Sequence, residues 1–112
     1  KGDITMYSKV QIRIILDDGG GMVLVVWRDK YAHYYDYADQ LAEDIILLRD
    51  GETTTSWDNN EWGTGISFSD SSCRVYQGTP QQVIKEILKD YRNDDIYGNN
   101  HIELAKTLKN IK

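Results

Sequence analysis

Nucleophilic and metal-binding side chains are scarce in this 112-residue chain, which has one cysteine and two histidines. A triad-type hydrolase needs its nucleophile beside a base, but no motif around Cys73 is typical of a nucleophile turn or a helix start. A lone cysteine in a strand-like stretch is usually a small buried apolar residue. His33 and His101 stand far apart, without partners at the spacings of a zinc site. We therefore expect no enzyme activity, no metal site and no cofactor.

Two loops match ligand-binding motifs only in part. Residues 58–61 begin like a calcium loop, but Trp62 replaces an oxygen donor at the fifth position, and Ser69 stands at the twelfth, where that loop has a glutamate. Residues 19–21 are three glycines without the spacing or the lysine of a phosphate-binding loop. The eighteen acidic residues will form some close pairs by chance, and a chain this short seldom encloses the sugar cleft of a glycosidase.

The remaining constellation is aromatic and acidic. Asp36, Asp39 and Glu43 are spaced three and four apart, so they share one face of a predicted helix, and no apolar residue accompanies them there. Carboxylates at these spacings lie about 5–6 Å apart, which is of the order of phosphate spacing on a nucleic-acid strand. The same pattern is also typical of an ordinary solvated helix face. The predicted partner-binding residues are Tyr35, Asp36, Tyr37, Asp39, Glu43, Asp44, Asp50, Asp58 and Glu61.

The charge distribution points to a protein partner with a basic surface and away from direct nucleic-acid binding. The formal net charge is −5, and residues 17–61 hold eleven acids against three bases. Such a block repels nucleic acid, whose affinity for proteins comes largely from lysine and arginine, and it speeds encounter with a basic surface. An acidic balance that serves only solubility is the alternative.

Two predicted helices carry basic faces that would suit phosphate instead. Four acids near these bases reduce the positive electrostatic potential, and the chain as a whole lacks the excess of basic residues expected of a nucleic-acid-binding protein. The bases are Lys85, Lys89, Arg92, Lys106, Lys109 and Lys112, and the acids are Glu86, Asp90, Asp94 and Asp95.

Length and cysteine usage predict a single cytoplasmic domain over residues 1–112. The longest apolar run, Met22 to Trp27, is too short to cross a bilayer, so no membrane association is expected. Residues 1–5 are expected to be flexible or to precede a native start at Met6.

Hydrophobic periodicity predicts the elements that position these residues. Residues 9–17 alternate as a half-buried strand, and Met22 to Arg28 is apolar on both faces, so the two predict a hairpin with a central second strand. A helix is predicted from about Asp36 to Asp50, and Gly51 follows as its C-terminal cap. Its apolar stripe is Tyr34, Ala38, Leu41, Ile45 and Leu48.

The second half of the chain predicts short strands and then two helices. Residues 52–57, 65–69 and 73–76 are strand-like, and Thr79-Pro80 with Gln82 is typical of a helix start with a capping box. Asn100 with Glu103 repeats that pattern. The order β-β-α-β-β-α-α predicts an α+β fold, an antiparallel sheet of four or five strands with helices packed on one face.

Three functions fit this description. The first is a small inhibitor that imitates DNA against a nucleic-acid enzyme such as a nuclease, as an anti-restriction or anti-CRISPR protein of a phage or other mobile element would. The second is an immunity or antitoxin protein that caps a basic toxin. The third is an adaptor whose exposed aromatic residues bind a neutral partner. Charge-steered binding weakens steeply with salt, which separates the first two functions from the third.

Overall fold

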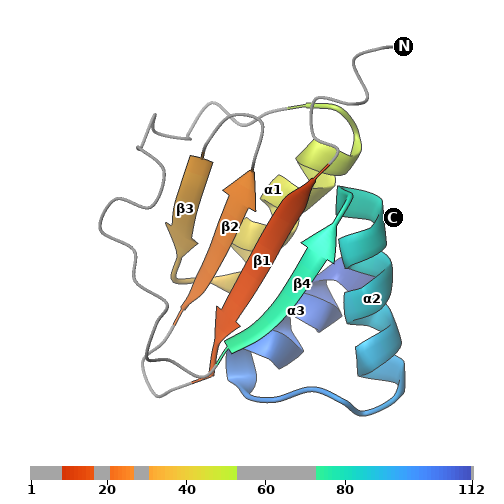
Figure 1. The fold of residues 1–112 in the computed structure, drawn as a ribbon. Coiled ribbons are helices and arrows are strands. Elements are labelled where there is room, and N and C mark those ends of the chain that lie inside the picture. The colour runs from red at the N-terminus through yellow and green to blue at the C-terminus, as the bar shows by residue number, and fades with distance from the viewer. Residues whose placement is uncertain (1–8, 17–20, 27–30, 53–72, 112) are drawn as a thin grey trace.

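The computed structural model describes residues 9–16, 21–26, 31–52 and 73–111. These residues form four strands and three helices in the order β-β-β-α-β-α-α. The strands make one antiparallel sheet in the spatial order β3-β2-β1-β4, and the helices lie on one face of it (Figure 1). The predicted α+β class and four-strand antiparallel sheet are therefore confirmed.

The two central strands form the predicted hairpin. β1 (Val10–Ile15) pairs with β2 (Met22–Val26) so that Ile12 faces Leu24. Every second residue of β1, beginning at Val10, is fully buried toward the helices, which confirms the alternation seen in the sequence. All of β2 is buried, as expected of a strand that is apolar on both faces and lies between two neighbours.

The third strand corrects the apolar stripe of the predicted helix, which begins at Tyr34. Tyr31–Tyr35 is β3, and it pairs with β2 at one edge of the sheet. Side chains of a strand alternate between faces, so Tyr35 enters the core at 2% exposure while Tyr34 is 43% exposed on the other face. Tyr34 lies over Gly21, where a Cβ atom would stand 2.5 Å from the tyrosine hydroxyl.

α1 (Ala38–Arg49) follows β3 after a short turn, and the predicted stripe from Ala38 onward is its buried side. Its C-terminus is a Schellman motif, in which the Gly51 N–H bonds to the Leu48 carbonyl at 3.1 Å and the Glu52 N–H to the Leu47 carbonyl at 2.8 Å. Gly51 has φ +83°, a conformation that glycine adopts without steric cost. The predicted cap is confirmed.

β4 (Cys73–Gly78) pairs with β1 at the other edge of the sheet, and α2 (Pro80–Arg92) runs beside it (Figure 1). The predicted capping box of α2 forms. The Gln82 N–H donates to Thr79 Oγ1 at 3.1 Å, and the Thr79 N–H donates to Gln82 Oε1 at 2.9 Å.

α3 (Asn99–Asn110) packs against α1 and α2 and carries Leu104, Ala105 and Leu108 into the core. The capping box predicted from Asn100 and Glu103 is wrong, because the helix begins two residues earlier than an N-cap at Asn100 requires. Its N-cap is Gly98, which has φ +95° and makes no side-chain cap bond.

Several predicted segments lie outside the described residues. These are residues 1–5, the strand at 65–69 and all but the first residue of the strand at 52–57.

Candidate protein-binding surface

α1 separates a core side from an acidic side. Leu41, Ile45 and Leu48 are buried, whereas the carboxylates of Asp39 and Glu43 are exposed on the opposite side. Asp36 is exposed in the turn that leads into the helix, just before its N-cap, Tyr37. The predicted acidic face of Asp36, Asp39 and Glu43 therefore does point away from the core. We call these three residues the α1 acidic face.

None of the three carboxylates of the α1 acidic face has an ion-pair partner among the described residues. Asp50, at the far end of the helix, is exposed but pairs with Arg49 at 2.9 Å. Residues 31–52 hold six acids and a single base, Arg49. No cation in the described part of the chain therefore offsets the charge of the α1 acidic face through a salt bridge.

Tyr37 is the exposed aromatic residue of this surface. Its side chain is 65% exposed, the largest value for an apolar or aromatic residue in the described ranges. It is followed by the first turn of α1 and lies between Asp36 and Asp39 in the sequence. Tyrosine combines a large apolar ring with a polar tip and is enriched at protein interfaces, so Tyr37 supplies packing area beside the charges.

Two predicted surface residues, Tyr35 and Asp44, are instead buried against each other. The Tyr35 hydroxyl donates to Asp44 Oδ2 at 2.6 Å, and the two side chains are 2% and 9% exposed. The strand alternation of β3 turns Tyr35 inward, and Asp44 lies on the sheet side of α1, so the pair joins β3 to α1. These residues are not available to a partner. Asp58 and Glu61, also predicted, lie outside the described residues.

The residues weighed as catalytic or metal-binding are placed as follows. Cys73 is half-buried at the start of β4. His33 lies in β3 with its ring edge-on to Tyr35 at 4.6 Å, and its buried Nδ1 has no hydrogen-bond partner among the described residues. The described ranges contain no cluster of three or more histidine, cysteine or carboxylate side chains that could bind a metal ion.

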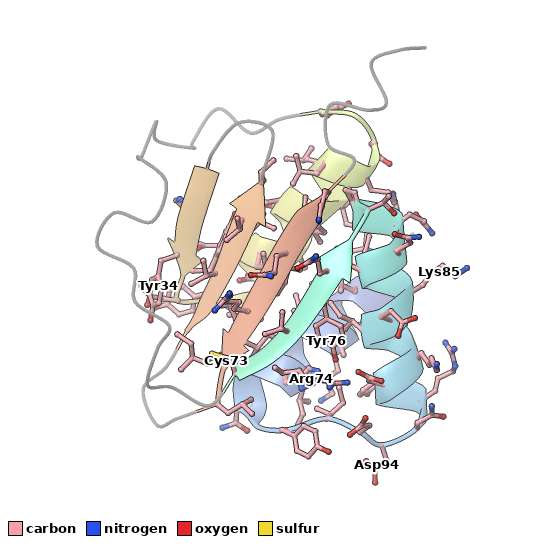
Figure 2. All side chains as sticks on the ribbon, in the orientation of Figure 1. Tyr34, Cys73, Arg74, Tyr76, Lys85 and Asp94 are labelled. Atoms are coloured by element: carbon pink, nitrogen blue, oxygen red, sulfur yellow. The ribbon has the colours of Figure 1, made fainter. Side chains whose placement is uncertain are left out.

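A buried polar network at the other side of the molecule was not predicted. It joins Arg74 and Tyr76 of β4, Asp90 of α2 and His101 of α3. Figure 2 shows Arg74 and Tyr76 on β4, beside α2. The Tyr76 hydroxyl lies 2.6 Å from Asp90 Oδ2 and 2.7 Å from His101 Nε2, and the Arg74 guanidinium pairs with the same carboxylate oxygen.

Burial and hydrogen bonding shift the pKa of each group in this network. Burial and the bond to Asp90 raise the pKa of Tyr76 above its usual range. Burial also works against ionised Asp90, but the bonds from Tyr76 and Arg74 outweigh it and hold the Asp90 pKa below its usual value. Burial, assisted by the positive charge of Arg74, lowers the pKa of His101. At neutral pH the network therefore holds an ionised Asp90, an ionised Arg74, a neutral Tyr76 and a neutral His101.

The network is saturated, which argues for a structural role. His101 uses both ring nitrogens, because Nδ1 accepts from the Tyr97 N–H at 3.1 Å while Nε2 bonds to Tyr76. Tyr76 and His101 are 5% and 0% exposed, so neither presents a free base or nucleophile to a substrate. The network ties β4 to the two C-terminal helices.

The basic residues of α2 form the surface most unlike the α1 acidic face. Lys85, Lys89 and Arg92 are exposed, and Figure 2 shows Lys85 on the outer side of α2, away from the sheet. Glu86 is exposed among them. The acidic dilution expected from the sequence is thus present on this helix, whereas residues 36–48, which span the α1 acidic face, contain no lysine or arginine.

In the part of the chain that the structure describes, no helix has the length and apolar character needed to cross a membrane. Comparison with protein-family models, with curated proteins and with solved structures finds no match for this chain.

Proposed function

We propose that this protein is a small binding module whose α1 acidic face docks on a basic surface of another protein, and that it acts as an inhibitor of a nucleic-acid enzyme. The observation that carries the proposal is the exposure of Asp36, Asp39 and Glu43 without ion-pair partners in the described chain. A row of exposed carboxylates is complementary in charge to the lysine and arginine side chains of a basic surface.

A protein that normally binds nucleic acid has the surface that fits best. Asp39 and Glu43 lie one helical turn apart, a spacing at which Cβ atoms are about 5–6 Å from each other, which is of the order of phosphate spacing. A groove that binds a phosphate backbone through lysine and arginine would accept this row in place of DNA. Tyr37 adds apolar area that phosphate lacks, which favours a protein interface over a purely electrostatic contact.

The proposal is tested with two variants that remove the same charge from different faces. The test variant carries Asp36→Asn, Asp39→Asn and Glu43→Gln. The matched control carries Glu86→Gln, Asp94→Asn and Glu103→Gln, three exposed acids that are not part of α1. Each protein is immobilised and used to capture partners from a lysate, which are identified by mass spectrometry. A supporting result is a basic protein retained by the wild type and the control but lost by the test variant.

Competition with free double-stranded DNA then identifies the kind of partner. If DNA displaces the captured protein, the α1 acidic face occupies its nucleic-acid site and the inhibitor proposal holds. If DNA does not compete although the three charges are needed, the partner is a basic protein bound elsewhere, as an immunity protein would bind a toxin. Equal capture by wild type and test variant would contradict both.

A further inference from the structure

The hydrogen bonds around His101 determine which of its nitrogens carries a proton. His101 is fully buried in the first turn of α3, and its Nδ1 lies 3.1 Å from the backbone nitrogen of Tyr97. A backbone N–H can only donate, so Nδ1 must accept and carries no hydrogen. Neutral imidazole then has its single N–H at Nε2.

This tautomer determines which group donates in each of the other hydrogen bonds of the network. Nε2–H donates to the Tyr76 hydroxyl oxygen at 2.7 Å, which leaves the Tyr76 proton for Asp90 Oδ2 at 2.6 Å. Arg74 donates to the same carboxylate. Every proton along this chain, from the Tyr97 amide to Asp90, has an acceptor only while His101 is neutral.

A second proton on His101 would break the first bond of the chain. It would have to attach to Nδ1, where it would point at the N–H of Tyr97, so two donors would face each other at 3.1 Å. The amide belongs to the connection between α2 and α3, residues 93–98. Two residues of this connection have positive φ: Asp94, its second residue, with φ 58°, and Gly98, its last, with φ 95° (Asp94 is labelled in Figure 2).

We propose that His101 is a proton-controlled latch for residues 93–98. When His101 is neutral, Nδ1 holds the backbone of Tyr97 against the buried network. When His101 is protonated, the bond is lost and the connection is released from β4, together with the 3.7 Å pair between Asp95 and Arg74. The latch lies away from the α1 acidic face and is independent of the proposed partner.

The charges that face His101 come from every element around it. Arg74 of β4 opposes protonation, whereas Asp90 of α2 and Asp95 of the connection favour it, and burial decides the balance against the charged form. Tyr76 of β4 is neutral and accepts from Nε2. The buried carboxylate of α1, Asp44, bonds to Tyr35 of β3. The latch is therefore closed at neutral pH and opens under acidic conditions.

The tautomer is tested directly by long-range nitrogen–proton NMR on the wild-type protein at neutral pH. We expect the proton on Nε2 and none on Nδ1. A His101 ring protonated at Nδ1 would overturn the proposal without any variant being needed.

The release is tested by amide hydrogen exchange between pH 7 and pH 5, expressed as protection factors so that the intrinsic pH dependence is removed. Protection of the Tyr97 amide should fall by about tenfold per pH unit below pH 6.5, down to the pKa of latched His101, because opening takes up one proton. The Leu24 amide, in a central strand, serves as the reference for global unfolding. The proposal is overturned if Tyr97 protection is flat with pH or equals that of Leu24 throughout.

Two variants assign the effect to Nδ1. His101→Asn places an amide oxygen near the position of Nδ1, where it accepts from the Tyr97 N–H but cannot gain a proton, so the pH dependence of Tyr97 protection should vanish. Tyr76→Phe removes the partner of Nε2 and leaves Nδ1 free to titrate, so the pH dependence should remain. A His101→Asn protein that keeps the wild-type pH dependence would refute the latch.

Discussion

At the scale of single residues, two neighbouring tyrosines lie in opposite environments. Tyr34 and Tyr35 are chemically identical, yet Tyr35 is buried with Asp44 while Tyr34 is half exposed over Gly21. Sequence patterns placed them the other way round because the spacing from Tyr34 to Ala38 suits a helix. The network of Arg74, Tyr76, Asp90 and His101 had no sequence signal either, since its members come from three elements and pair only through the fold.

The Tyr76 hydroxyl is the central atom of that network, so its removal should be costly. Tyr76→Phe removes one buried hydrogen bond from Asp90, which keeps its pair with Arg74, and one from His101, which keeps the bond from the Tyr97 N–H. We expect a loss of about 1–3 kcal/mol in the free energy of unfolding. Tyr91→Phe, in a half-buried tyrosine of α2, is the control and should change it by less than about 0.5 kcal/mol. Urea unfolding measures both, and equal losses would show that the network contributes no stability.

At the scale of elements, local signals predicted the helices and missed one strand. The capping box at Thr79 and Gln82 and the stripe through Leu41, Ile45 and Leu48 depend on residues close in sequence, so they could be predicted. β3 could not, because its tyrosines become a strand by pairing with β2. Among the predicted partner-binding residues, exposure was predicted correctly for Asp36, Asp39 and Glu43, but not for Tyr35 of β3 or for Asp44 of α1, which bury each other.

Substitutions on the two sides of α1 test which side of the helix faces the core. Ile45→Ala removes a fully buried side chain from the main core and should cost about 2–5 kcal/mol. Glu43→Ala, two residues earlier on the exposed side, should cost under about 0.5 kcal/mol. Chemical denaturation measures the loss in free energy of unfolding for both variants. Equal losses would contradict the placement of Ile45 on the buried side of α1 and Glu43 on the exposed side.

The C-terminus of α2 holds an aspartate where glycine is preferred. Asp94 has φ 58° in a Schellman motif whose bonds run from the Asp94 N–H to Tyr91 and from the Asp95 N–H to Asp90. Asp94→Gly removes the side chain that disfavours this conformation and should stabilise the protein by up to about 1 kcal/mol. Asp94→Asn removes only the charge and separates the two effects. A less stable Asp94→Gly protein would show that the carboxylate itself is needed.

At the scale of the whole molecule, the buried ionisable groups predict that acid destabilises the fold. Unfolded His101 takes up a proton near pH 6.5, but folded His101 resists it to lower pH. Its contribution to stability is therefore complete above pH 6.5 and is lost as the pH falls. Asp90, whose pKa is lowered in the folded state, adds a second loss below about pH 4. The free energy of unfolding, measured by urea titration at each pH, should fall in both ranges, and a value that is flat between pH 7 and 5 would contradict the neutral His101.

At the same scale, acidic and basic residues occupy different parts of the molecule. Residues 31–52 are strongly acidic, while the exposed bases of α2 lie on a different face beside β4 (Figures 1 and 2). A basic partner would be steered toward the α1 acidic face, which raises association rates by about 10- to 1,000-fold at low salt.

The most direct test of the proposed function is the association rate with a captured basic partner as a function of ionic strength, from about 0.05 to 0.5 M salt. We predict fast association of the wild type that slows steeply with salt. The variant with Asp36→Asn, Asp39→Asn and Glu43→Gln should associate slowly at low salt and lose most of the salt dependence, and its melting temperature should stay near that of the wild type. The matched control with Glu86→Gln, Asp94→Asn and Glu103→Gln should behave like the wild type. If the α1 variant associates as fast as the wild type at every salt concentration, the α1 acidic face is only a solvated surface and the account is wrong.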